Sequence, residues 1–191
     1  AACHTALKQG PGYAMALKLC RALSAQTSAA LVIMTYANIP FQIGFDTFCK
    51  TVKSHGVTGL IVPDLPFDCE DGMALQLVCK KYNLNLIQVV SPGIKEDRLR
   101  QVIACSRGFI YCTTSRGTTG RKIQMSKDLV NLIVKIKKHT DLPIAVGFGF
   151  SSEKDITPLK KHADMFVFGS VFIKLLKTKN GFKKIYQLVK S

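Results

Sequence analysis

Two glycine-containing turns near the carboxyl end of the sequence contain the residue types that bind phosphate. The first is Gly147-Phe148-Gly149 and the second is Gly169-Ser170, and each follows a short β-rich run and precedes a helical pattern. Glycine lets backbone amides approach an anion closely, and the helix that follows adds partial positive charge. A glycine cluster alone usually indicates only a turn, but two in succession are typical of the phosphate site of a parallel α/β barrel.

Among the acidic residues, Asp64 has the sequence position most typical of a catalytic group in a barrel enzyme. It follows the apolar run 59–62 and Pro63, at the carboxyl end of a predicted strand. Barrel enzymes carry their chemistry at such ends. The histidines lie mostly in helical patterns, without metal-ligand spacing, and therefore predict no metal site: His4, His55, His139 and His162.

The composition limits the class of protein. Seven scattered cysteines without a Cys-x-x-Cys motif indicate reduced thiols, and with no secretory signal pattern they predict a cytoplasmic protein. Apolar runs are shorter than a membrane span of about 20 residues. The net charge of +15 comes from lysines at helical spacing, which favours solvated helix faces over a nucleic-acid surface and helps to attract an anionic small substrate.

Six buried runs alternate with helical patterns and position these residues. We expect helices over about 1–26, with a break at 10–12, and over about 45–55, 68–82, 95–106 and 127–138. Two short helical pieces, separated at 180–181, are expected after Ser170. Residues 37–41 are expected to form a turn. The expected strands are 30–36, 59–62, 85–90, 108–112, 142–146 and 165–168.

This alternation predicts an α/β fold with a parallel sheet. A closed (β/α)8 TIM barrel needs eight strands and typically about 250 residues. We therefore expect residues 1–191 to be a single barrel domain holding strands three to eight, with an N-terminal strand-helix-strand absent from this sequence. A complete open doubly wound sheet is the alternative.

With the strands placed, their end motifs resemble the tryptophan synthase α subunit family. The matching motifs lie in order and at family spacing: 34–38 (MTYAN), 59–66 (GLIVPDLP), 108–111 (GFIY) with 117–120 (GTTG), 146–149 (VGFG) and 168–170 (FGS). The resemblance implies a carbon–carbon lyase that cleaves indole-3-glycerol phosphate to indole and glyceraldehyde 3-phosphate, without metal or organic cofactor of its own. It also implies a β subunit partner in an αββα complex, and only that partner holds pyridoxal phosphate.

The resemblance also assigns the site residues. The phosphate would be bound by Gly120, Gly149, Gly169 and Ser170; the indole ring would lie near Met34, Tyr36, Tyr111 and Phe148; Gly117 and Thr119 would belong to a closing loop; and Asn38, Phe41, Asp64 and Pro66 would face the β subunit.

The family's two catalytic carboxylates, a Glu and an Asp, are expected upstream of Ala1. Two classes of function stay open, because every motif present serves binding or docking: an active lyase, or a catalytically silent subunit that binds the phosphate ligand and regulates its β partner. Another phosphate-binding barrel is a further alternative, but it does not account for residues 62–66. A nucleic-acid binder is the last alternative, and the distribution of the lysines along helix faces disfavours it.

Overall fold

The structure is a computed structural model that describes residues 12–113, 127–147, 149–150 and 152–190. The chain divides into two compact units, residues 1–88 with 105–108, and residues 89–104 with 109–191. Each unit is described by itself, and the prediction of a single domain stays a prediction. None of the helices in the described ranges has the length and apolar character needed to cross a membrane.

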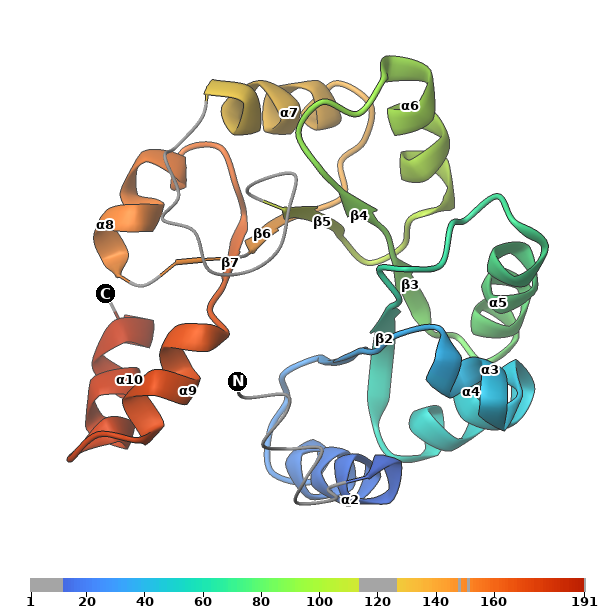
Figure 1. Cartoon of the computed structure of the whole chain (residues 1–191), viewed down its shortest axis with the longest axis horizontal. Coiled ribbons are helices and arrows are strands. Elements are labelled where there is room, and N and C mark those ends of the chain that lie inside the picture. Colours follow the sequence, from blue (N-terminus) through green and yellow to red (C-terminus); the bar gives the residue numbers. More distant parts are fainter. Residues whose placement is uncertain (1–11, 114–126, 148, 151, 191) are drawn as a thin grey trace. The chain divides into compact units, whose positions relative to one another are not determined.

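The first unit has a three-stranded parallel sheet in the order β1-β2-β3. Helices α4 and α5 pack beside β2 and β3 (Figure 1). The core lies between these helices and the sheet, where Phe48, Val52, Leu60 and Leu75 are almost fully buried. The elements are α2 (Tyr13–Ser24), β1 (Leu31–Met34), α3 (Asn38–Ile43), α4 (Phe45–Ser54), β2 (Val57–Ile61), α5 (Glu70–Lys81) and β3 (Asn85–Ile87).

The second unit has a four-stranded parallel sheet in the order β4-β5-β6-β7. Figure 1 shows α6 and α7 on the outer side of β4, β5 and β6. Helices α9 and α10 pack against each other after β7. The elements are β4 (Val89–Val90), α6 (Glu96–Cys105), β5 (Ile110–Thr113), α7 (Lys127–Lys137), β6 (Ile144–Gly147), α8 (Glu153–Ile156), a 3₁₀ turn (Thr157–Leu159), β7 (Met165–Val167), α9 (Ser170–Leu176) and α10 (Gly181–Lys190).

Periodicity predicted most of these elements, but the strand expected over 85–90 is wrong as a single strand. It is divided at Gln88 into β3 and β4. The reason is that the two halves have different neighbours: β3 pairs with β2, whereas β4 pairs with β5.

The turn expected at 37–41 is also wrong, because residues 38–43 form the helix α3. Pro40 is compatible with this helix since it lies in the first turn, where backbone N–H groups have no partner within the helix. The Pro40 side chain is buried. Gly44 ends the helix with a φ of 85° and donates its N–H to the Phe41 carbonyl.

Candidate functional site

The predicted phosphate turns come together at one edge of the second sheet. Strands β5, β6 and β7 are parallel neighbours, with Tyr111 in register with Ala145 and Ala145 in register with Met165. Their carboxyl ends therefore meet at the same edge, which places the turn after β6 next to the turn after β7. Gly149 belongs to the first of these turns, and Gly169 and Ser170 belong to the second.

The two glycines differ in what their backbones require. Gly149 has a φ of 90°, a conformation that other L-residues rarely adopt. Gly169 has a φ of −116°, and a Cβ added to it would meet no atom within 4 Å. Glycine is thus needed for the backbone at position 149, whereas at position 169 it leaves open space in front of α9.

The helices that follow these turns have different N-termini. At α8, the Ser152 N–H donates to Asp155 Oδ2 at 2.8 Å in a capping box, so a carboxylate of the same helix already satisfies it. Within the described residues, no side chain caps α9, and its first turn has no acidic residue. Of the two helix N-termini, that of α9 is therefore the one suited to an anion.

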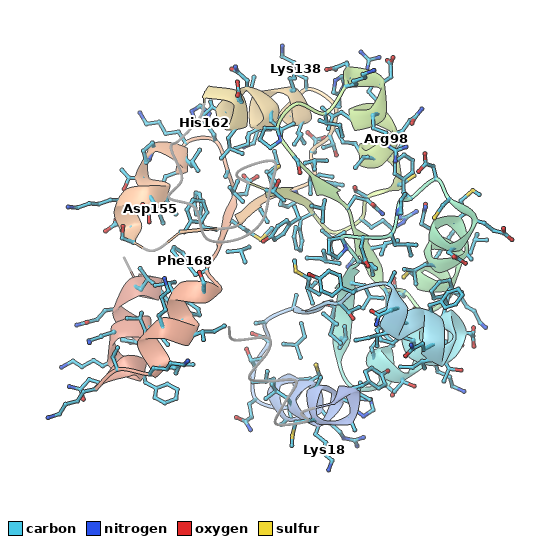
Figure 2. All side chains as sticks on the ribbon, viewed as in Figure 1. Lys18, Arg98, Lys138, Asp155, His162 and Phe168 are labelled. Carbon is cyan, nitrogen blue, oxygen red and sulfur yellow. The ribbon has the colours of Figure 1, made fainter. Side chains whose placement is uncertain are left out.

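An aromatic cluster fixes the two turns relative to each other. The Phe150 ring, buried at 2% exposure, lies 6.0 Å from the Phe166 ring and 5.9 Å from the Phe168 ring, centroid to centroid. The Phe168 ring stacks on Phe172 of α9 at 6.0 Å. Figure 2 labels Phe168, which lies between β7 and α9, and Asp155 on α8. The sequence interpretation missed this cluster, because aromatic residues in strands and helices indicate only a core.

A polar pair lies at the ends of β4 and β5 in the same sheet. The Thr113 hydroxyl donates to Ser91 Oγ at 2.8 Å, and both residues are half-buried. Because these two strands are parallel neighbours, the pair extends the row of strand ends beyond the glycine turns.

Tyr111, predicted to line the indole pocket, is buried on β5 with 4% exposure. Burial raises the pKa of its hydroxyl to about 12, so the phenol is neutral at ordinary pH. Met34 and Tyr36 lie in the first unit with 48% and 68% exposure. Tyr111 belongs to the second unit and Met34 and Tyr36 belong to the first, so the indole pocket stays a prediction.

Four predicted site residues lie outside the described residues. They are Gly117, Thr119, Gly120 and Phe148.

The predicted partner-facing residues gather at the carboxyl edge of the first sheet. Asn38 and Phe41 are exposed on α3, and Asp64 and Pro66 are exposed in the segment after β2. The two segments are in contact, because Asp64 Oδ1 accepts a hydrogen bond from the Ala37 N–H at 2.9 Å. One continuous surface therefore contains both pairs of residues.

The segment after β2 is itself fixed on α5. The Gln76 side chain donates to the Phe67 carbonyl at 2.7 Å, and the Cys69 thiol donates to the Pro66 carbonyl at 3.1 Å. A Cβ at Gly72 would come within 1.9 Å of the Pro66 carbonyl oxygen. Only glycine at this position lets α5 pack so closely against the segment.

Two histidines, His139 and His55, make local contacts within the described residues. His139 Nε2 lies 2.6 Å from Glu96 Oε1, and His55 Nδ1 lies 2.7 Å from the Thr51 carbonyl. In the described ranges no group of three or more His, Cys, Asp or Glu side chains could hold a metal ion.

Comparison with known proteins finds a matching family and similar sequences. A family model described as the tryptophan synthase alpha chain matches residues 1–190. The tryptophan synthase alpha chain of Helicobacter hepaticus is 34% identical over 92% of this chain and 67% of its own length. That of Carboxydothermus hydrogenoformans is 34% identical over 90% of this chain and 63% of its own length. The chain thus spans about two thirds of the length of these relatives.

Solved structures agree with the sequence comparison. A chain of Mycobacterium tuberculosis tryptophan synthase superimposes with a TM-score of 0.84 at 28% identity, covering 97% of this chain and 69% of that one. A chain from the tryptophan synthase α2β2 complex of Pyrococcus furiosus gives 0.86 at 26% identity, covering 98% and 76%. These neighbours are (β/α)8 barrels, so the predicted fold class is confirmed.

Proposed function

This chain belongs to the tryptophan synthase alpha chain family, and from that premise we propose that it works as the α subunit of a tryptophan synthase. The reaction is the retro-aldol cleavage of indole-3-glycerol phosphate to indole and glyceraldehyde 3-phosphate. It needs one carboxylic acid that protonates the indole carbon bearing the side chain, and one carboxylate that takes the ring N–H proton. In the family both come from a region ahead of the first motif matched here.

The convergence of the turns after β6 and β7 is the observation that carries this proposal. The N–H groups of Gly149, Gly169 and Ser170, with the Ser170 hydroxyl, would donate to the phosphate of the substrate. The uncapped N-terminus of α9 and the open space at Gly169 support this role. The aromatic cluster around Phe150 would hold the donors in place without moving when ligand binds.

Tyr111 would contribute to the indole pocket as a neutral group. Its raised pKa keeps the phenol protonated, so it would act by shape and polarity and not as a base. Met34 and Tyr36 would supply apolar surface for the ring, as their exposed side chains allow.

The partner would be a β subunit that receives the indole. One solved neighbour is a chain of an α2β2 complex, and the surface formed by α3 and the segment after β2 offers exposed apolar and polar groups for docking. Phe41, with 62% exposure, is the side chain best placed to anchor such an interface. Pyridoxal phosphate would be held by the partner, and this chain would use no cofactor of its own.

We place the protein in the cytoplasm. The buried thiols of Cys49 and Cys79 lie 4.0 Å apart, Sγ to Sγ, as a hydrogen-bonded pair and not as a disulfide. Neighbouring cysteines that are not bonded to each other suit a reducing compartment.

A second candidate is a silent α subunit kept for regulation of its partner. It is motivated by the motifs of this sequence, which all serve binding or docking; Asp64, whose carboxylate accepts the Ala37 N–H, is one of these docking residues. Ligand binding at the phosphate turns would then affect the partner without turnover here.

Indole release from indole-3-glycerol phosphate, measured with the protein alone and with its β subunit, tests the proposal. We expect release that rises on adding the partner, because docking would close the site over substrate. No release, with the partner's own reaction still stimulated, would establish the silent subunit. No release and no stimulation would contradict both candidates.

A further inference from the structure

Asp64 makes a hydrogen bond within the chain at the place where the sequence suggested contact with a partner. Its Oδ1 accepts the N–H of Ala37 at 2.9 Å, across 27 residues of sequence. Asp64 follows β2 and Ala37 precedes α3, so this bond joins the end of a strand to the start of a helix.

The helix α3 is supported at its beginning by the packing of Ala37 against the core of the first unit and by the Asp64–Ala37 bond. It has six residues, and no side chain of the described ranges caps it, since its N-cap residue is Ala37. Helices of this length are unstable in isolation. The ladder between β1 and β2 continues only to the Thr35 N–H, which donates to the Ile61 carbonyl at 3.0 Å. The Asp64–Ala37 bond is a further contact between the two segments beyond this ladder.

The other end of the bond belongs to a rigid segment. The Leu65 N–H donates to the Val62 carbonyl at 3.3 Å, and the Pro66 carbonyl lies against Gly72 of α5. Asp64 is therefore held from both sides in the chain, by the turn after β2 and by the packing of Pro66. The fixed partner in the pair is Asp64, and the element that it positions is α3.

The side chains presented by this helix are exposed. Phe41 has 62% exposure and is supported by an edge contact with Phe45 at 6.3 Å between ring centroids. An aromatic anchor loses binding energy when its backbone can move, because ordering it then opposes association.

We propose that Asp64 is a positioning residue for the docking surface, acting as a hydrogen-bond acceptor that holds α3 on the end of β2 and so pre-orders Asn38 and Phe41 for a β subunit. This inference rests on the proposed function. It differs from a direct contact between the Asp64 charge and the partner in one chemical respect. Positioning needs an oxygen acceptor at Oδ1, whereas a charge contact needs the carboxylate.

Two substitutions separate these roles. Asp64→Asn keeps a carbonyl oxygen that can accept the Ala37 N–H but removes the charge, and Asp64→Ala removes both. The first readout is hydrogen exchange of the Ala37 amide in the protein alone. We expect exchange roughly tenfold faster in Asp64→Ala and close to wild type in Asp64→Asn.

The second readout is the affinity for the β subunit, from titration of the partner's activity. We expect roughly five- to tenfold weaker binding for Asp64→Ala and less than about a twofold change for Asp64→Asn. Phe41→Ala should weaken binding without changing Ala37 exchange. Asp141→Asn, at an exposed residue of the second unit, is the control for net charge and should change neither readout.

Equal losses of affinity for the Asn and Ala variants would overturn the inference in favour of a charge contact. Unchanged Ala37 exchange in Asp64→Ala would overturn it as well, since the bond would then hold nothing. If the wild-type protein neither binds nor stimulates a β subunit, the proposed function fails and the docking role fails with it. The exchange data would still decide whether Asp64 holds α3.

Discussion

The hydroxyl of Tyr111 on β5 occupies the space that a side chain on Gly147 of β6 would need. A Cβ built on Gly147 would lie 2.0 Å from Tyr111 Oη and 2.5 Å from its Cζ. The two strands are hydrogen-bonded neighbours, and Gly147 is in register with Thr113, two residues beyond Tyr111. The missing side chain at position 147 therefore lets the Tyr111 side chain lie against the backbone of β6, at the edge that carries the predicted phosphate turns.

Gly147→Ala should destabilise the second unit. Both strands are buried here, so the Tyr111 ring can move only by disturbing its neighbours, and we expect a loss of about 1–3 kcal/mol in the free energy of unfolding. Urea denaturation measures it. Adding Tyr111→Phe should restore only part of the loss, because Cζ remains too close. Gly169→Ala, where a Cβ meets no atom, is the matched control. Equal stability of Gly147→Ala and wild type would contradict the packing described.

Stability should fall in alkaline solution partly because of Tyr111. Its pKa is about 12 in the folded protein and 10.0 as the reference value, because burial disfavours the phenolate. Below pH 10 both states keep the proton and there is no effect. Between pH 10 and 12 the unfolded chain releases it first, so the free energy of unfolding should decrease by about 1.4 kcal/mol per pH unit from this group.

Denaturation of wild type and Tyr111→Phe at several pH values from 9 to 11.5 checks this. The slope should be smaller in the variant, with a remaining part from Cys112, whose pKa burial also raises to about 12. Identical slopes for the two proteins would show that Tyr111 is not the titrating group.

Gly169→Ala should reduce affinity for the phosphate group while leaving the fold intact. The methyl group would enter the open space in front of α9, where the phosphate is proposed to approach the backbone closely. We expect at least about tenfold weaker binding of glycerol 3-phosphate by calorimetry. Ser170→Ala should lose less, about three- to tenfold, because it removes one hydroxyl donor.

Unchanged thermal stability of both variants is the control for folding. Wild-type affinity in Gly169→Ala would place the phosphate elsewhere and would remove the main support for the site.

The contact between Glu96 and His139 should make stability depend on acid pH. The hydrogen bond from His139 holds the pKa of Glu96 below its usual value of 4.5, with smaller effects from Lys135 and Arg100. A lowered pKa stabilises the folded state above about pH 4.5, and this contribution is lost as pH falls through the folded value. Glu96→Gln should therefore lower Tm by about 1–3 °C at pH 6 and by less at pH 3.

Thermal denaturation at both pH values measures this difference. Asp97→Asn, the next residue on α6, controls for the loss of an acidic group from the first turn of the helix. An equal decrease in Tm at pH 6 and pH 3 would show that ionisation of Glu96 is not involved.

Some features of the site could be predicted from local sequence alone. The alternation of apolar runs and helical patterns places each strand end, because burial on both faces of a parallel sheet requires continuous apolar runs. The sequence also contains the difference between the N-termini of α8 and α9. Ser152 and Asp155 have the spacing of a capping box, whereas no acidic residue follows Gly169 in the first turn of α9. The sequence interpretation treated both helix N-termini alike, and the structure corrects it.

Other features depend on contacts between distant residues and have no local signal. The sequence predicts a turn at residues 37–41, yet residues 38–43 form a helix, in which Pro40 is buried and before which Asp64 accepts the Ala37 N–H from 27 positions away. The division of the third predicted strand at Gln88 follows from the two neighbours that its halves find.

The sequence by itself determined the order of strands and helices, the family motifs and the glycines of the predicted phosphate turns, because these depend on residue type and short-range spacing. Tertiary structure decided the contact between Tyr111 and Gly147, the cluster of Phe150 with Phe166 and Phe168, and the intramolecular use of Asp64. These arise only when separate strands pack side by side, since an unpaired strand does not specify which atoms it will meet.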